Sequence, residues 1–486
     1  MKKIIVYISL LVSTVTASCN KFLEEKPEDF DFLSPENFPQ TDKDAELMLA
    51  GTLNRVRAQG YYDRGFYFVS EIGGELVNSV LPVQSRLDFD YYTWNAGNEN
   101  TVSFWQQAYS AIDGANTMIK KIPVAPKMTD EKKAQYVGTA RFIRAMAYFD
   151  LVRAFGDLPL LTEPVTEPEK ALSLKRSPIR EVYDVIVADL QYAGDKLPEN
   201  WSGGAGRPVK MAARALLSRV YLTMAGEPLK DASKWIKAVE EARAVVTNGK
   251  FRLLPDFGNL WKIANNNNTE VLFAIQFYTA SSGGTMMAVQ SRPLNAGNEA
   301  GWGFWTTTEA FMNEFPDNDK RKAATFLTSL GGLHYKQFTA PQPCLAKWSD
   351  AGRAVFLDKN RRTDLAVPVI RYAEVLLNLA EAENEANGPT DAAYTAIGEV
   401  RARAGLTELA KGMSQEEFRQ AVRFERKHEL AFEYNRRFDL VRWGQLDPVM
   451  GNDPLSKAAY KSFKKLYPIP ENEISINPNI KQNDGY

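Results

Sequence analysis

Paired stretches of helical hydrophobic periodicity run through most of this 486-residue chain, and this feature constrains its fold more than any other. Apolar side chains recur at the spacing of an amphipathic helix, and alanines such as Ala108, Ala145 and Ala213 stand where two helices would cross. Helix pairs that bury their apolar faces on one another favour tetratricopeptide-like stacking. The predicted helices begin near Asp44 and then cover roughly 101–121, 130–155, 178–197, 208–225, 232–248, 368–387, 390–404 and 414–436.

Two segments interrupt this pattern. Residues 59–100 are loop-rich and aromatic, and residues 250–350 carry β-like pieces such as 271–275 among loops rich in Gly and Asn. Because stacked helix pairs leave long loops free to carry function, we expect an all-α fold whose helix pairs form a scaffold for a loop-rich region with minor β structure. The expected boundaries are a leader at 1–18, a tether at 19–42, an N-terminal helical region at 43–250, and a C-terminal region at 251–486 that packs with it as one unit.

The first residues predict export and a lipid anchor. Two lysines precede an apolar run at 4–12, and small residues then lead to Ala17-Ser18-Cys19. A cysteine at this place can be thioether-linked to diacylglycerol and become the first residue after cleavage, although Thr16 stands where the usual lipobox has Leu. The alternative is an ordinary secreted protein in which Cys19 is incidental. No later segment approaches 18 uninterrupted apolar residues, so any membrane attachment falls to Cys19.

Composition excludes several classes of function. With 59 basic and 60 acidic residues, the chain has no global electrostatic attraction to nucleic acid. If Cys19 is lipidated, Cys344 is the only remaining thiol and no internal disulfide can form. The two histidines, His334 and His428, make no Cys/His zinc cluster, and neither an HExxH motif nor a P-loop is present. We therefore expect no metal and no cofactor, and we interpret both histidines as structural.

The densest charge pattern lies near the C-terminal end of the last long predicted helix. Glu425, Glu429 and Glu433 follow one another at i,i+4, where like charges repel unless basic groups meet them. Arg436 and Arg437 stand close enough to do so, and the predicted helix at 130–155 offers further arginines among apolar residues. One interpretation is a carboxylate pair for glycoside hydrolysis. We favour a structural lattice of interhelical ion pairs, because these acids come amid arginines rather than in an aromatic cleft.

Four sets of residues, taken together, resemble one family. They are Cys19 followed by Phe-Leu-Glu-Glu-Lys-Pro at 22–27, the stretch 144–159, the stretches 371–383 and 425–443, and the tail segments 466–470 and 477–486. Each is similar to the corresponding part of SusD/RagB-family lipoproteins from Bacteroidetes. The stretches run in order from the leader to the last residue, so the resemblance covers the whole chain.

The resemblance implies a nutrient-binding lipoprotein of the outer membrane, lipid-anchored and facing the cell exterior, in which four tetratricopeptide-like helix pairs hold an irregular loop-rich region. It also implies a SusC-like TonB-dependent barrel as partner, over whose mouth the protein would lie as a lid and to which it would deliver oligosaccharides. The acidic pair Glu24-Glu25 is similar to the signal that sends such lipoproteins to the surface. The family implies no catalytic residue, so we expect a binding protein and not an enzyme.

The ligand site is argued from the chemistry of sugars, since no motif carries individual positions over from the family. Sugars present flat C–H faces ringed by hydroxyls, so a site needs exposed aromatic planes with polar groups at their edges. Two loop regions meet that description. The candidates are Tyr61, Tyr62, Glu75, Arg86, Trp94, Asn95 and Asn98 in the first region, and Gln276, Tyr278, Arg292, Asn295, Trp302 and Trp305 in the second. The alternative is that each tryptophan fills the packing beneath its loop.

Three other functions stay open at this point. An α-helical glycoside hydrolase would show two acids flanking an aromatic cleft. A repeat-type adaptor would bind proteins only, and a peptide-binding lipoprotein would use the same loops for a different ligand. The residues alone do not distinguish a glycan from a peptide, nor one glycan from another.

Overall fold

The computed structural model of this protein describes residues 37–80, 82–167, 169, 172–202, 206–280, 283–349 and 362–486. The expected leader, the lipidation site Cys19 and the tether up to residue 36 lie outside the described residues. Within the described ranges, no helix is both long enough and apolar enough to cross a membrane.

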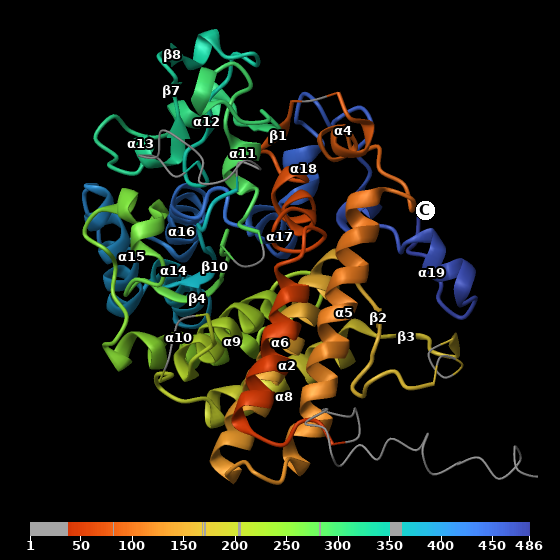
Figure 1. Cartoon of the computed structure of the whole chain (residues 1–486). Helices are drawn as coiled ribbons and strands as arrows, with labels where there is room; N and C mark the ends of the chain where they lie inside the picture. Colours follow the sequence, from red (N-terminus) through yellow and green to blue (C-terminus); the bar gives the residue numbers. More distant parts are fainter. Residues whose placement is uncertain are drawn as a thin grey trace, which may run out of the picture.

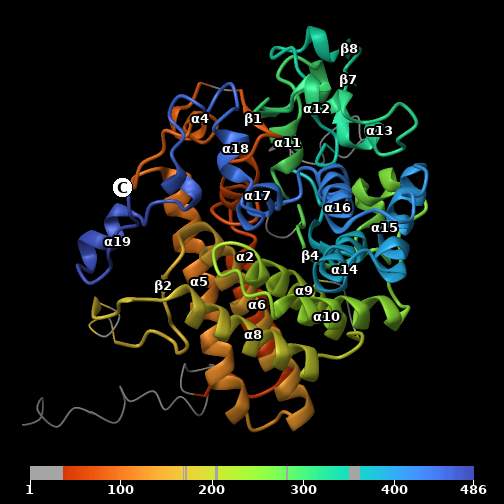
Figure 2. The same cartoon turned by 180° about the vertical axis from the view of Figure 1, so that it is seen from behind.

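Stacked helices form one part of the molecule, as predicted, and Figure 1 shows them in its lower half and, for α14, α15 and α16, at mid-height on the left. Each helix packs on the next along the chain, and α10 then packs on α14, which also contacts α15 and α16. Figure 2 shows α14 beside α9 and α10 from the opposite side, with α16 above α14. The scaffold consists of α2 (Asp42–Val56), α5 (Glu99–Lys121), α6 (Asp130–Phe155), α8 (Ile179–Lys196), α9 (Lys210–Ala225), α10 (Lys234–Asn248), α14 (Tyr372–Asn387), α15 (Asp391–Ala404) and α16 (Gln415–Glu429). The expectation of a mostly helical fold is confirmed.

Helix α6 is the central element of this scaffold. It contacts both α5 and α8, and from residue 135 to 155 every side chain except that of Arg141 is buried. A helix that is covered on all sides must pair its own charges, and Arg144 lies 2.7 Å from Asp189 of α8. The Thr129 side chain accepts a hydrogen bond from the Lys132 amide at the start of the helix.

Two predicted helix boundaries are wrong. The helix expected at 368–387 begins only at Tyr372, because Val367–Arg371 forms strand β10 and pairs with β4 (Val271–Ile275). Its β-branched residues suit a pleated, buried strand, and the register shifts next to Pro368, which cannot donate to the ladder.

The helix expected at 414–436 ends at Glu429, and the chain resumes as α17 (Arg436–Arg442). Phe432 and Tyr434 lie between the two helices with φ angles of 71° and 63°, a left-handed conformation that side chains rarely adopt. Both side chains are buried among aromatic rings, and this packing offsets the backbone strain.

Short elements and loops form the other part of the molecule, in the upper half of Figure 1. The helical turns are α3 (Gly65–Tyr67), η3 (Phe68–Ile72), α4 (Gln84–Tyr91), α11 (Met287–Ser291), α12 (Glu309–Asn313), α13 (Lys322–Thr325), α18 (Leu446–Met450) and, at one side, α19 (Glu471–Ile476). The strand pairs of this part are β1 (Asn78–Ser79) with β5 (Trp305–Thr306), β6 (Phe326–Leu327) with β9 (Cys344–Leu345), and β7 (Ser329–Leu330) with β8 (Leu333–His334). The pair of β2 (Leu158–Pro159) with β3 (Arg176–Ser177) lies lower in Figure 1, beside the helical scaffold. The predicted loop-rich region with minor β structure is therefore present.

A buried lattice of ion pairs surrounds Glu425, Glu429 and Glu433. Burial acts to raise the pKa of Glu429, but the arginines around it, Arg403 foremost, hold that pKa well below its usual range. A general acid of glycoside hydrolysis needs a raised pKa and an open cleft, so the geometry favours the structural interpretation. The basic partners of the three glutamates are Arg321, Lys347, Arg371, Arg401 and Arg403.

The partners that we expected for this lattice are wrong. Arg436 instead pairs with Glu75, and Arg437 donates to the hydroxyl of Tyr467 at 2.8 Å. The chain turns away after Glu429, and α17 packs against η3, which takes both arginines out of reach of the lattice. Arg144 and Arg153 of α6 pair with Asp189 and Asp150.

Candidate functional site

The two loop regions singled out in the sequence meet in space. Strand β1 pairs with β5, so that Asn78 lies opposite Thr306 and Ser79 opposite Trp305. The backbone amide of Val80 donates to the carbonyl of Phe304 at 2.9 Å, which continues the contact beyond the strands. Residues from 61–98 and from 276–305 can therefore contribute to one surface.

Arg86, Trp302 and Phe304 form a platform at this junction, which we call the aromatic platform. The guanidinium carbon of Arg86 lies 3.8 Å from the centroid of the Phe304 ring. The Trp302 and Phe304 rings lie 5.3 Å apart, centroid to centroid, at an interplanar angle of 35°. Trp302 is partly exposed, whereas Phe304 is almost covered. The arrangement offers the partly exposed indole of Trp302 next to the Phe304 ring, which carries the Arg86 guanidinium over its face.

Backbone hydrogen bonds hold the Trp302 loop in place. The amide of Trp302 donates to the carbonyl of Val289 at 2.6 Å, and that of Gly303 donates to the carbonyl of Arg292 at 2.8 Å. Gly303 has a φ of +59°, which favours glycine over any residue with a side chain. The indole is therefore presented by an ordered turn on the N-terminal side of β5.

Polar groups flank the aromatic platform. Burial, and after it repulsion from Arg64, lowers the pKa of Arg86, while the nearby carboxylate of Glu99 opposes this effect. Glu99 also accepts a hydrogen bond of 2.7 Å from the hydroxyl of Ser85. Guanidinium N–H groups donate hydrogen bonds to hydroxyl oxygens, and a carboxylate accepts hydrogen bonds from hydroxyl groups. Arg86 and Glu99 can therefore bind the hydroxyl groups at the edge of a sugar whose C–H face lies on an aromatic ring.

Two of the predicted tryptophans are core residues, and the expectation that they present exposed faces is wrong. Trp305 is 0% exposed, and its ring lies 4.5 Å from that of Tyr67. Trp94 is 3% exposed, and its indole N–H donates to the Tyr486 hydroxyl at 2.8 Å. Both loops fold down onto the aromatic core, where a large apolar ring gains more from burial than from contact with water.

Three other predicted ligand-binding residues, Tyr61, Tyr62 and Glu75, form hydrogen bonds or ion pairs inside the protein. The hydroxyls of Tyr61 and Tyr62 both donate to the buried carboxylate of Asp150, at 2.7 and 3.1 Å. Glu75 pairs with Arg436. These side chains stabilise the fold from positions with little or no access to a ligand.

Arg292 and Asn98 have structural roles as well. The buried guanidinium of Arg292 donates to the carbonyl of Ser349 at 2.7 Å. Asn98 precedes α5, and its side chain accepts from the amide of Asn100 at 3.1 Å, as a helix cap does.

The remaining candidates lie at the surface but not all in one place. Asn95 and Asn295 are exposed. Tyr278 is 50% exposed and, with Gln276, lines a separate cavity of about 420 Å³ beside α2. The structure thus brings Arg86 and Trp302 together and leaves Tyr278 at a distinct groove.

Sequence reasoning missed Phe304, although a signal for it existed. Residues that lead into a strand alternate between its two faces, so Phe304 and Trp305 must point to opposite sides. Trp305 faces the core, which places Phe304 toward Arg86.

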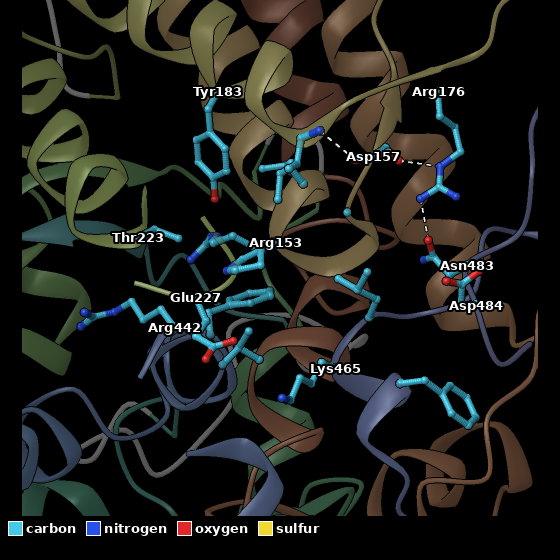
Figure 3. Close-up of a pocket in the computed structure, with 18 of the residues that line it drawn as sticks. Arg153, Asp157, Arg176, Tyr183, Thr223, Glu227, Arg442, Lys465, Asn483 and Asp484 are labelled. Carbon is cyan, nitrogen blue, oxygen red and sulfur yellow. Dashed lines mark hydrogen bonds between the residues drawn. The ribbon is translucent and has the colours of Figure 1, made fainter. Parts of the chain in front are cut away.

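Another cavity, of about 570 Å³, lies elsewhere and is shown in Figure 3. None of the ligand-binding residues predicted from the sequence lines it.

Comparisons with known proteins agree along the whole chain. A family model described as the SusD family matches residues 335–486, and a second one, described as starch-binding and associating with the outer membrane, matches residues 21–222. A curated relative, the SusD-like protein P2 of Formosa agariphila, is 31% identical over 100% of both chains.

Solved structures share the fold. A SusD homolog from Bacteroides thetaiotaomicron has a TM-score of 0.85 at 25% identity, over 95% of this chain and 100% of that one. A laminarin-binding SusD-like protein has a TM-score of 0.78 at 25% identity, over 92% of this chain and 100% of that one.

Proposed function

Because this chain belongs to the SusD/RagB family of Bacteroidetes, we propose that it is a cell-surface glycan-binding lipoprotein that captures oligosaccharides and delivers them to a SusC-like TonB-dependent transporter. It acts as a binding protein and not as an enzyme. Its place is the outer membrane, where Cys19 carries the lipid anchor and the folded part faces outward.

The aromatic platform is the observation that carries this proposal. A partly exposed indole beside Phe304, with the Arg86 guanidinium over the Phe304 ring, matches what a sugar needs from a protein surface. Glycine turns around Trp302 give the backbone room to approach a ligand closely.

The relatives favour a glycan over a peptide as the ligand. One similar structure is described as laminarin-binding, and the family model over residues 21–222 is described as starch-binding. Laminarin and starch are both polysaccharides, so the shared chemistry is a chain of sugars rather than a particular one.

The buried lattice supports binding without hydrolysis. Glu425 and Glu429 are fully buried and paired with arginines, so they are not arranged as an acid and a nucleophile on either side of a glycosidic bond.

Gentle detergent extraction of the native membranes tests the delivery step. The protein should co-purify with a TonB-dependent barrel, and the complex should retain added oligosaccharide without releasing shorter sugars. Co-purification with a different class of protein, together with no retention of any glycan, would instead support a protein-binding adaptor.

A further inference from the structure

Three segments of the chain that carry the family resemblance converge on the cavity of about 570 Å³ in Figure 3. Gly156 and Asp157 come from the end of the first stretch, Phe438 and Val441 from the charged stretch, and Asn483 from the tail. The volume is in the range of cavities that hold small organic ligands. The cavity shares no residue with the aromatic platform, so the proposed glycan site does not account for it.

The polar end of the cavity has hydrogen-bonding capacity that the protein leaves unused. Tyr183 is only 2% exposed, and Figure 3 shows its hydroxyl pointing into the cavity on the same side as Arg153. Among the described residues this hydroxyl has no hydrogen-bond partner. Burial raises the pKa of Tyr183 well above its usual value, so the hydroxyl stays protonated and can donate. The hydroxyl faces the cavity, so an acceptor atom of a ligand can take its hydrogen bond in place of water.

Arg153 supplies a second donor at the same end. Its Nε donates to the carbonyl of Phe149 at 3.1 Å and its Nη2 to Asp150 at 2.6 Å, and no partner within the described ranges meets Nη1. The guanidinium stacks on Phe149 and Phe438, with distances of 3.9 and 4.1 Å to the ring centroids. Packing and pairing therefore fix its direction, which preorganises the site for an acceptor.

Apolar side chains make up most of the remaining wall, although Glu227, Arg442 and Lys465 also line it, and the C-terminal tail forms one side. Val152, Ile179 and Leu466 line it together with Phe438 and Val441. Arg176 holds the tail at that side by donating to Asn483 at 2.5 Å and to the carbonyl of Lys481 at 2.8 Å. An apolar body with one acceptor end would fill this shape.

We propose that this cavity is a second binding site, distinct from the glycan surface, for a small apolar molecule that carries one hydrogen-bond acceptor. The acceptor, a carboxylate or an amide carbonyl, takes the Tyr183 hydroxyl and Arg153 Nη1, and the apolar body lies against Val441 and Leu466.

Titration of the purified protein with three probes tests this assignment. Two probes carry an acceptor, 3-phenylpropionate and 3-phenylpropionamide, and the third, propylbenzene, has none. Calorimetry or ligand-observed NMR measures the binding of each. At least one acceptor probe should bind, and propylbenzene should bind at least fivefold more weakly, as expected for the loss of one or two hydrogen bonds. The carboxylate and the amide distinguish a charged acceptor from a neutral one.

Two variants and their matched controls locate the binding. Val441→Phe fills the cavity and should weaken the bound acceptor probe by an order of magnitude or more, whereas Val187→Phe, at a partly buried valine outside the cavity, should not. Tyr183→Phe removes only the hydroxyl and should weaken binding about fivefold, whereas Tyr221→Phe should not. If neither acceptor probe binds, if all three bind equally, or if neither cavity variant changes the affinity, the proposal is wrong.

Discussion

The guanidinium carbon of Arg86 lies 3.8 Å from the centroid of the Phe304 ring, and this contact joins two loops that are far apart in the sequence. Arg86 thereby contacts the ring that neighbours Trp302, the one tryptophan among the predicted ligand-binding residues that stays partly exposed. A cation over an aromatic ring contributes about 0.5–1 kcal/mol at an exposed site, which is enough to orient the side chain beside a ligand.

The charge lattice should be structural. Glu429→Ala would take one fully buried carboxylate away from Arg371 and Arg403, so we expect the free energy of unfolding to fall by roughly 3–5 kcal/mol. Urea denaturation measures this loss. Glu416→Ala, at an exposed position of the same helix, is the matched control and should leave the stability nearly unchanged.

Glycan affinity in the folded fraction of Glu429→Ala separates the two interpretations of these acids. It should equal that of the wild type. A variant of normal stability that no longer binds or cleaves sugar would overturn the structural role.

Stability should fall with rising pH because of Glu71. Its Oε1 accepts from the Asn435 amide at 2.7 Å, but burial raises its pKa to about 8. In the unfolded chain the same carboxyl loses its proton above its ordinary pKa of 4.5. The folded state therefore holds a proton that the unfolded chain has already lost, and stability is lost as pH rises through 8.

Two other buried groups, His428 and Lys347, make the protein more stable as pH rises, but only below pH 6.5 and above pH 8 respectively. Burial lowers the pKa of His428 from 6.5 to about 4 and that of Lys347 from 10.5 to about 8. Between pH 6.5 and 8 neither opposes Glu71, so the wild type should lose up to about 2 kcal/mol relative to Glu71→Gln across that window. Urea unfolding of both proteins at several pH values measures this difference. If the free energy of unfolding changes with pH in the same way in both, the assigned role of Glu71 is wrong.

Trp305 should behave as core. Trp305→Ala removes a fully buried ring that packs on Tyr67 and Phe68, and we expect it to destabilise the protein by roughly 3–5 kcal/mol. Thermal unfolding compared with Trp302→Ala is the measurement. Equal melting temperatures for the two variants would show that the burial difference between them has no energetic consequence.

The anchor assignment concerns Cys19. Cys19→Ala should release the protein from membranes or leave the leader uncleaved, because a basic and apolar leader ends on Ala17-Ser18-Cys19. Membrane fractionation and intact mass measure both outcomes. A mature, acylated variant that still fractionates with the outer membrane would mean that the anchor lies at another residue.

Local signals predicted the helical scaffold well. Helix α5 was expected at roughly 101–121 and spans Glu99–Lys121, and α6 matches its predicted range of 130–155. Hydrophobic periodicity is a property of neighbouring residues, so the sequence alone reveals it. The break after Glu429 has no such signal, since Phe432 and Tyr434 adopt positive φ only because surrounding rings hold them.

The candidate site was predictable as two loops but not residue by residue. Trp302 and Trp305 stand in the same glycine-rich segment, and only the pairing of β5 with β1 turns one toward solvent and the other into the core. The ion-pair lattice was likewise predictable as a feature but not in its partners. Glu429 pairs with Arg321, Arg371 and Arg403, which no local sequence pattern connects to it.

The affinity of Trp302→Ala for the glycan that the wild type binds tests the central claim most directly. Calorimetric titration over a panel of polysaccharides should find at least one ligand, with a Kd on the order of micromolar to millimolar, or about −8 to −4 kcal/mol. An aromatic platform contributes on the order of 1 kcal/mol per stacked sugar, so the variant should bind at least fivefold more weakly at an unchanged melting temperature. Binding of that glycan by Trp302→Ala with wild-type affinity would contradict the placement of the site, and no binding of any glycan by the wild type would contradict the proposed function.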